Sequence, residues 1–375
     1  MSTSASASPV YFADMRCPMD YSLLTKMQKL LRTAGLTGME LAGKFVAIKM
    51  HFGEPGNLAF LRPNFARCVA DMVREQGGLP FLTDCSTLYA GRRRHALEHL
   101  AAAQENGFSP LSTGCQLLIG DGLRGTDDVE VPVPGGEIFR TARIGRVIMD
   151  ADVFISLNHF KGHKRTGFGG AIKNVGMGCG SRAGKMAMHC CGKPVVTPEK
   201  CRGCGICMRF CGQQAIGWDD GHKAVIDQEA CVGCGRCIGA CSQDAIFSAI
   251  DAASDKLNAR MAEYAAAVLH GRPHFHISVA NNISPCCDCH GGNDAAIVPD
   301  IGIFASFDPV ALDQACMDAV NAAPVIGSSL LGQCRHDGGD RFSALHPDTH
   351  GTSQVEHAER IGLGTRRYEL ITVSA

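Results

Sequence analysis

The chain has 375 residues, of which 45% are apolar and 19% are charged, and its formal net charge is −1. This composition indicates a globular protein and excludes a disordered or collagen-like chain. Because 36 basic residues balance 37 acidic ones, we expect no nucleic-acid partner, and no run approaches the ~18 apolar residues of a membrane span.

The first ~190 residues alternate helix and strand patterns, which predicts an α/β domain. The expected elements are a helix over 23–34 that stops at Gly35, a strand over 44–51, a helix over 65–73 and a strand over 79–84. The last three form a βαβ unit, so we expect a parallel-type sheet. The apolar run over 144–157 can be divided between helix and strand in more than one way.

The same pattern returns near residue 250. The expected elements are a helix capped by Ser254 and stopped by Gly271, strands over 275–280 and 301–305, a helix from Asp308-Pro309 to about 320, and a short helix and strand after 352. We therefore predict a split α/β domain of residues 10–195 and 250–375, after a disordered 1–9, with an α+β module of residues 196–249 inserted between its halves.

Twenty cysteines are the compositional outlier, and ten of them fall between residues 190 and 241. The first nine residues lack the basic start and apolar region of a secretion signal, so we expect a reducing, cytoplasmic location and little exposure to oxygen. Clustered thiols in such a compartment more often bind metal than form disulfides.

Two segments of the insert, 201–216 and 231–246, are identical at nine of sixteen positions, and each carries the pattern C-x2-C-x2-C-x3-C. The intervening glycines allow tight turns around a metal cluster. Zinc ribbons are the alternative, but they leave the evenly spaced third cysteine of each run without a role.

The insert resembles the bacterial two-cluster ferredoxins, although Gly212 and Ser242 stand where those proteins usually have proline. The resemblance implies two 4Fe-4S clusters, with the fourth cysteine of each run bound to the other cluster. The implied ligands are Cys201, Cys204, Cys207 and Cys241 for the first cluster, and Cys231, Cys234, Cys237 and Cys211 for the second.

A glycine-rich stretch over 158–191 combines histidines, lysines and cysteines but matches neither a dinucleotide fingerprint nor a Walker loop. One interpretation is an anion-binding nest of backbone N–H groups near Lys173 and Lys185, with Gly169 and Gly170 as further cofactor-binding candidates. The alternative is a glycine-rich turn that lets two elements pack closely.

A C-x-C motif follows the strand expected over 275–280, where α/β proteins tend to place their sites. Cys287 and Cys289, with Cys179, are candidate ligands of a third metal or cluster, because thiolates favour zinc, copper(I) or iron. The alternative is that these thiols are small packing residues. His51, which follows a strand, either faces the same cleft or is a satisfied polar histidine.

Segments spread over most of the chain resemble the domain-of-unknown-function family numbered 362, whose members are described as uncharacterised iron-sulfur centre proteins. The segments are 10–16, 47–57, 81–89, 159–179, 287–290 and 297–313. The resemblance supports a split domain with a ferredoxin insert but implies no reaction.

The stretch from His163 to Lys173 is also similar to lactate racemase, where a histidine precedes by ten residues the lysine that carries a nickel-pincer nucleotide. This likeness implies that His163 is a catalytic acid/base or metal ligand and that Lys173 anchors a cofactor. The other motifs of that family are not evident here.

The leading functional hypothesis is a redox enzyme, or reductive activating subunit, in which two clusters feed electrons to a site in the α/β domain. It implies a redox partner protein and a small-molecule substrate. An electron carrier or adaptor that serves a partner enzyme, and a metal or cluster assembly protein, are the alternatives.

Overall fold

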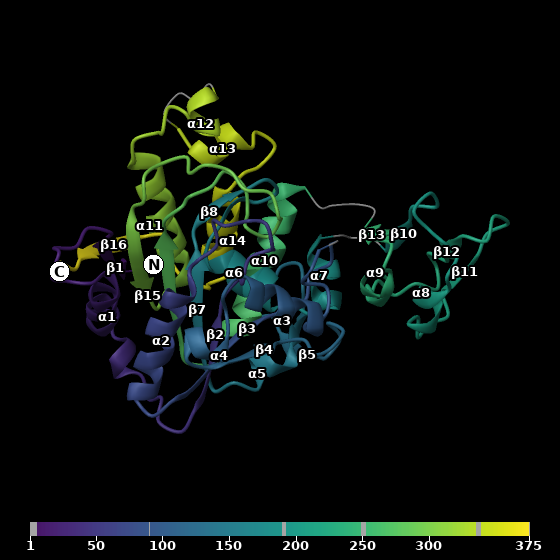
Figure 1. Cartoon of the computed structure of the whole chain (residues 1–375), viewed down its shortest axis with the longest axis horizontal. Coiled ribbons are helices and arrows are strands. Elements are labelled where there is room, and N and C mark those ends of the chain that lie inside the picture. Colours follow the sequence, from purple (N-terminus) through teal and green to yellow (C-terminus); the bar gives the residue numbers. More distant parts are fainter. Residues whose placement is uncertain (1–5, 90, 190–192, 249–252, 335–338, 375) are drawn as a thin grey trace, which may run out of the picture.

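The structure is a computed structural model of the whole chain, and it describes residues 6–89, 91–189, 193–248, 253–334 and 339–374. An eight-stranded sheet forms the centre of the α/β domain (Figure 1). Its strands, in spatial order, are β16 (Tyr368–Thr372), β1 (Ser8–Asp14), β15 (Gly302–Ser306), β14 (His274–Ala280), β7 (Val153–His159), β2 (Phe45–Lys49), β3 (Leu79–Asp84) and β4 (Gln116–Ile119).

Neighbouring strands of this sheet are parallel except where β15 pairs with β1 and β14. The expectation of a mostly parallel sheet is therefore confirmed, with β15 as the strand that runs the other way. β15 is antiparallel because the chain passes from β14 to β15 without a helix between them, whereas parallel neighbours need a crossover connection.

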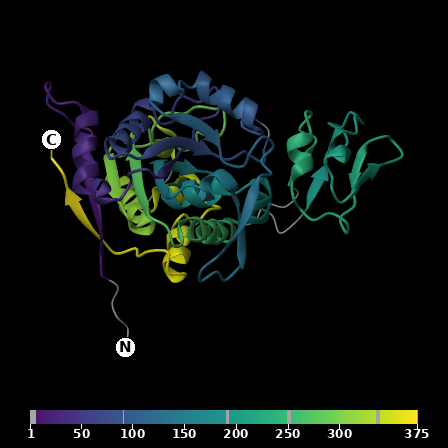
Figure 2. The ribbon, with the colours of Figure 1, turned by 90° about the horizontal axis from the view of Figure 1, so that it is seen from below.

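Helices cover both faces of the sheet (Figure 2). One face packs against α1 (Leu23–Thr33), α2 (Pro63–Glu75) and α3 (Ala96–Glu105); the other packs against α6 (Ala171–Cys179), α10 (Ser254–Leu269), α11 (Pro309–Ala322) and α14 (Thr352–Arg360). Side chains along β2 alternate between the two faces of the sheet. Val46 and Ile48 therefore join the core under α1 and α2, and Ala47 joins the core under α6 and α10.

Shorter elements complete this domain. They are η1 (Leu36–Gly38), α4 (Pro110–Thr113), β5 (Asp128–Pro132), β6 (Thr141–Gly145), α5 (Arg146–Met149), β8 (Lys161–His163), β9 (Gly167–Gly169), α7 (Arg182–His189), α12 (Leu330–Gln333) and α13 (Arg341–Leu345). The ambiguous run over 144–157 thus divides into the end of β6, the helical turn α5 and most of β7.

The cysteine-rich insert projects from one side of the α/β domain (Figure 1). It contains β10 (Pro194–Val196), α8 (Ile206–Arg209), β11 (Ile216–Trp218), β12 (Ala224–Ile226), α9 (Arg236–Ala240) and β13 (Ile246–Ser248). Its first and last strands, β10 and β13, pair with each other and close the insert.

Three local expectations need correction. Ser8 and Pro9 are not disordered but pair with β16, while residues 1–5 lie outside the described part of the chain. Ser254 is the first residue of α10 and not its cap, which is Ala253. The glycine-rich stretch over 158–191 is not a single loop or turn, because α6 and a second helix over 182–189 lie within it.

Among the helices that the structure describes, none has both the length and the apolar character needed to cross a bilayer.

Candidate functional site

The C-x-C motif lies in the loop that follows β14, and its two thiols meet a histidine from the β8–β9 hairpin. The Sγ atoms of Cys287 and Cys289 and one ring nitrogen of His163 all lie within 4.8 Å of one another, and all three residues are buried. Thiolate and imidazole are ligands for soft and borderline metal ions. The three residues therefore form a Cys/His group that is able to hold a metal ion.

Cys179, the other thiol predicted for this site, is not part of the group. It ends α6 in the apolar core, where its carbonyl oxygen lies 3.5 Å from the Cys85 Sγ. His163, for which the likeness to lactate racemase implied a catalytic acid/base or a metal ligand, takes its place.

Hydrogen bonds orient the imidazole of His163. Its Nδ1 lies 2.9 Å from the Thr166 Oγ1, which in turn lies 2.8 Å from the Phe168 carbonyl oxygen. The Arg165 N–H also donates to the His163 Nδ1, at 3.2 Å. Because these contacts are all made by Nδ1, they leave Nε2 free for a metal ion. Burial and Lys173 lower the pKa of His163 well below its ordinary value, so the ring is neutral.

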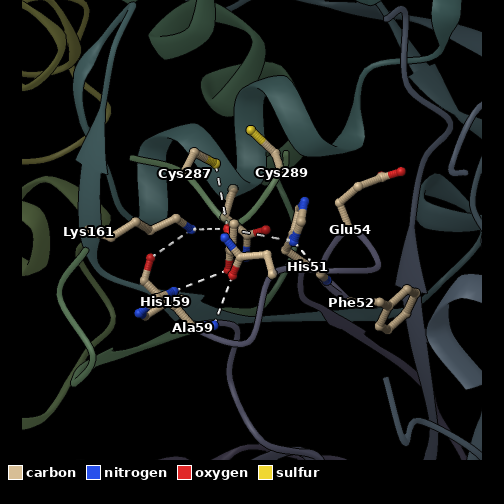
Figure 3. Close-up of polar contacts among 12 residues, drawn as sticks. His51, Phe52, Glu54, Ala59, His159, Lys161, Cys287 and Cys289 are labelled. Carbon is tan, nitrogen blue, oxygen red and sulfur yellow. Dashed lines mark hydrogen bonds and ion pairs between the residues drawn. The ribbon is translucent and has the colours of Figure 1, made fainter. Parts of the chain in front are cut away.

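Asp288, between the two cysteines, fixes the C-x-C loop through contacts with His51, His159 and Lys161, which Figure 3 labels. Its fully buried carboxylate lies 3.2 Å from the Lys161 Nζ, 3.1 Å from the His159 Nδ1 and 3.7 Å from the His51 Nδ1. Its carbonyl oxygen accepts from the Glu54 N–H at 3.0 Å. The Lys161 ammonium and the hydrogen bond to His159 hold the pKa of Asp288 well below its ordinary value despite burial. The loop is thus anchored by a buried, charged network.

The two thiols differ in acidity. A hydrogen bond from Cys287 lowers the pKa of Cys289 to about 6 against the opposing effect of burial, and Lys173 and Arg93 lower it further. Burial and the same hydrogen bond raise the pKa of Cys287 well above its ordinary value. The pair therefore carries one negative charge, and the Lys173 Nζ lies 3.8 Å from the Cys287 Sγ.

A cavity of about 590 Å³ opens beside this group. His51, Tyr89, Cys289 and His290 line it, together with two residues of the insert, Phe247 and Ser248. Seven lysines and arginines also line it, with Asp84 as the carboxylate; the cations are Lys49, Arg93, Lys161, Lys164, Arg165, Lys173 and Lys185. Its size suits a small-molecule ligand.

The predicted cofactor-binding residues line this cavity, but each of them also packs closely against, or hydrogen-bonds to, other parts of the protein. A Cβ at Gly170 would lie 2.2 Å from the Asp313 Oδ1, because that carboxylate accepts from the Ala171 and Ile172 N–H groups. The N-terminus of α6 is therefore already occupied by Asp313. A Cβ at Gly169 would lie 3.2 Å from the Lys173 Cδ. Lys185 reaches the cavity while its Nζ donates to the Gly180 carbonyl oxygen at 2.6 Å.

The structure gathers the eight cysteines of the insert around two small cavities. Cys201, Cys204, Cys207 and Cys241 line one, and Cys211, Cys231, Cys234 and Cys237 line the other. Backbone N–H groups donate to four of these sulfurs, from Ala224 to Cys201, Ala215 to Cys211, Gly233 to Cys231 and Ala245 to Cys241. Cys190 and Cys191 lie outside the described residues.

The second of these groups lies against the α/β domain. A Cβ at Gly235 would lie 2.7 Å from the Met186 Cγ and 3.5 Å from the Leu88 Cδ2. Leu88 and Met186 share an apolar cluster with Cys237 and Ile238. Next to Leu88, the ring of Tyr89 lies 5.2 Å from that of His290. A short run of side chains thus connects the insert with the C-x-C loop.

Comparison with known proteins identifies the family. The profile described as "Domain of unknown function (DUF362)" matches residues 46–318, well over half of the chain. The chain belongs to the DUF362 family. A thylakoid-associated protein of Synechocystis is 29% identical over 165 residues, which are 42% of this chain and 46% of the relative. The alignment thus spans less than half the length of that relative.

Two solved structures share a distant likeness with this DUF362 protein. The lactate racemase apoprotein of Thermoanaerobacterium thermosaccharolyticum is 12% identical, with a TM-score of 0.32, covering 72% of this chain and 50% of the racemase. A Thermotoga maritima protein is 11% identical, with a TM-score of 0.38, covering 80% of this chain and 58% of its own. Both scores are too low to carry a fold or an activity to this chain.

Three residues of the site were missed from the sequence. Asp288 stands between the two predicted ligands, and its position inside C-x-C was the available signal. Glu54 and Arg93, whose side chains pair at 2.7 Å, could not be recognised as site residues from the sequence. Arg93 is the middle of three consecutive arginines, a pattern typical of a solvated surface.

Proposed function

We propose that this DUF362 protein is an iron-sulfur redox protein that binds two 4Fe-4S clusters in its insert and delivers electrons to a metal ion held by His163, Cys287 and Cys289. The observation that carries the proposal is the exchange of the fourth cysteine between the two groups. Cys241 joins the first run and Cys211 the second, the arrangement that two-cluster ferredoxins use.

The insert fits such clusters in two further ways. Gly203, Gly205, Gly233 and Gly235 all have φ between 67° and 69°, which brings backbone N–H groups inward where side chains would clash. The N–H···S hydrogen bonds stabilise thiolate charge. Once bound, the clusters would accept and donate single electrons.

The chain's own residues supply the connection between the insert and the α/β site. Leu88 and Met186 exclude water at the contact, and the Arg93 Nη2 donates to both the Tyr89 hydroxyl at 2.9 Å and the Cys289 carbonyl oxygen at 3.0 Å. The other group includes the exposed Cys204 and faces away, which suits it to a redox partner protein.

Three protein ligands leave a coordination position open, which is the arrangement of catalytic rather than structural metal sites. That position adjoins the 590 Å³ cavity, where a small-molecule substrate would be reduced. Every cysteine that the structure describes is unpaired, which supports a reducing, cytoplasmic location.

Metal analysis tests the proposal. Anaerobically purified protein should contain about eight irons and eight acid-labile sulfides per chain, plus one further metal ion that Cys287→Ser with Cys289→Ser removes. Cys68→Ser, a buried thiol outside all three groups, serves as the control and should change neither number. Fewer than four irons per chain, or an extra metal that survives the double substitution, contradicts the proposal.

A further inference from the structure

We infer that the 590 Å³ cavity binds a small organic molecule with at least two anionic oxygen groups, carboxylates or phosphates. The inference deepens the proposed function, on which it rests, by naming the class of substrate. It starts from the charges on the cavity wall, where seven cations face Asp84.

Three of these cations are neutralised inside the protein. Lys49 pairs with Asp84 at 3.0 Å, Arg93 with Glu54 at 2.7 Å and Lys161 with Asp288 at 3.2 Å. In contrast, Lys164, Lys173 and Lys185 make no ion pair with any carboxylate in the described part of the chain. Lys185 is buried; its Nζ donates to the Gly180 carbonyl oxygen, and it interacts with the Asp121 carboxylate only from beyond ion-pair distance. A direct anionic partner in the cavity would stabilise its charge further.

Lys173 is half-buried on the cavity wall, and its Nζ lies 3.8 Å from the Cys287 Sγ. Because its ammonium has no carboxylate partner among the described residues, an anionic ligand in the cavity would supply a counter-charge.

Two buried polar atoms without a hydrogen-bond partner point to the same ligand. They are the His51 Nε2 and the Ser248 Oγ, and both residues line this cavity. The Gly53 N–H donates to the His51 Nδ1 at 2.9 Å, so Nε2 carries the ring proton as a donor. An anionic oxygen would satisfy both donors, whereas an apolar ligand would leave them unpaired.

Titration of the full-length, anaerobically purified protein tests the inference. Isothermal titration calorimetry would use inorganic phosphate, succinate and the neutral analogue succinamide. We expect saturable binding of at least one dianion and none of succinamide. Preference for phosphate or for succinate tells a phosphate-bearing from a carboxylate-bearing substrate.

Variants locate the binding. Lys173→Gln and Lys185→Gln should each weaken dianion binding about tenfold or more, because each removes a charge-assisted hydrogen bond. Lys164→Gln is a further variant at an exposed position in case the buried Lys185→Gln does not fold. Lys44→Gln, whose ammonium lies outside the cavity 3.8 Å from Glu40, is the matched control. Equal binding of succinamide and succinate, or lysine variants that bind like Lys44→Gln, overturns the inference.

The iron content of the same preparations separates this inference from the proposed function. About eight irons with no dianion binding rejects the inference alone. Dianion binding that requires Lys173 and Lys185 in protein unable to hold iron keeps the anion site and rejects the proposed function.

Discussion

The buried carboxylate of Asp288 decides whether the two thiols on either side of it can act as ligands. It is not one of the three residues of the Cys/His group; it holds the loop by pairing with Lys161 and His159. Residues that position ligands in this way affect metal affinity nearly as much as the ligands.

Asp288→Asn keeps the shape of this side chain and removes its charge. We expect it to weaken metal binding at the Cys/His group about 10- to 100-fold and to destabilise the fold by about 3 kcal/mol, because Lys161 is left buried without its partner. Metal content after dialysis against a weak chelator, with the thermal unfolding midpoint, checks both effects. The iron of the insert should not change. Asp294→Asn, exposed in the same loop, is the control, and equal metal retention by both variants would contradict the positioning role.

Single residues also show how much of the candidate site could be predicted from the sequence. Residue type and the C-x-C spacing were enough to select Cys287 and Cys289, because few other residues bind soft metals, whereas His163 was implied by the likeness to lactate racemase. Their meeting depends on a hairpin and a loop separated by more than a hundred residues, and no local pattern encodes it. Cys179 was grouped with them by type alone, and the fold buries it in the apolar core instead.

Helix α6 is the element that brings the cavity, the metal group and the core together. A Cβ at Gly176 would lie 2.0 Å from the Met261 carbonyl oxygen of α10, so this glycine allows the two helices to touch. Glycine disfavours helices, and this is why the glycine-rich stretch over 158–191 was interpreted as a nest or a turn and not as a helix. Close tertiary packing overrides that local preference, whereas helices with regular apolar spacing, such as α1 and α2, were predicted correctly.

The carboxylate of Asp313, on α11, fixes the start of α6, and burial raises its pKa to about 7. A folded-state pKa above the unfolded value stabilises the fold at low pH, and this contribution is lost as pH rises from about 4 to about 7. Between about pH 5.5 and pH 8 the loss amounts to about 2 kcal/mol.

Asp313→Asn removes this dependence, so its unfolding free energy relative to that of the native chain should rise by about 2 kcal/mol over the same interval. Chemical unfolding at the two pH values measures the difference. Asp318→Asn, at the half-buried end of the same helix, is the comparison variant. A difference between Asp313→Asn and the native chain that stays constant with pH would show that Asp313 keeps an ordinary pKa.

At the scale of the whole molecule, the chain combines two bodies with separate cores. Among the described residues, the two cores on the faces of the large sheet contain no residue of the insert. The insert has an apolar cluster of its own, to which the α/β domain contributes Leu88 and Met186. The thirty-residue repeat made this division predictable. The contact between the bodies was not predictable, because it depends on single side chains such as Arg94, which pairs with Asp244 at 3.1 Å.

Because the cores are separate, the α/β domain should fold without the insert. We expect that replacing residues 193–248 by a short Gly-Ser linker removes about eight irons per chain and leaves the metal ion at His163, Cys287 and Cys289. The cost is small, since a partly exposed ion pair such as Arg94–Asp244 contributes about 0–1 kcal/mol and Leu88 and Met186 lose part of their burial. Metal analysis and cooperative thermal unfolding of the shortened chain measure this outcome. If the shortened chain unfolds without cooperativity, the insert completes the α/β core. If the shortened chain folds but loses the remaining metal ion, Phe247 and Ser248 of the insert are needed to close the metal site.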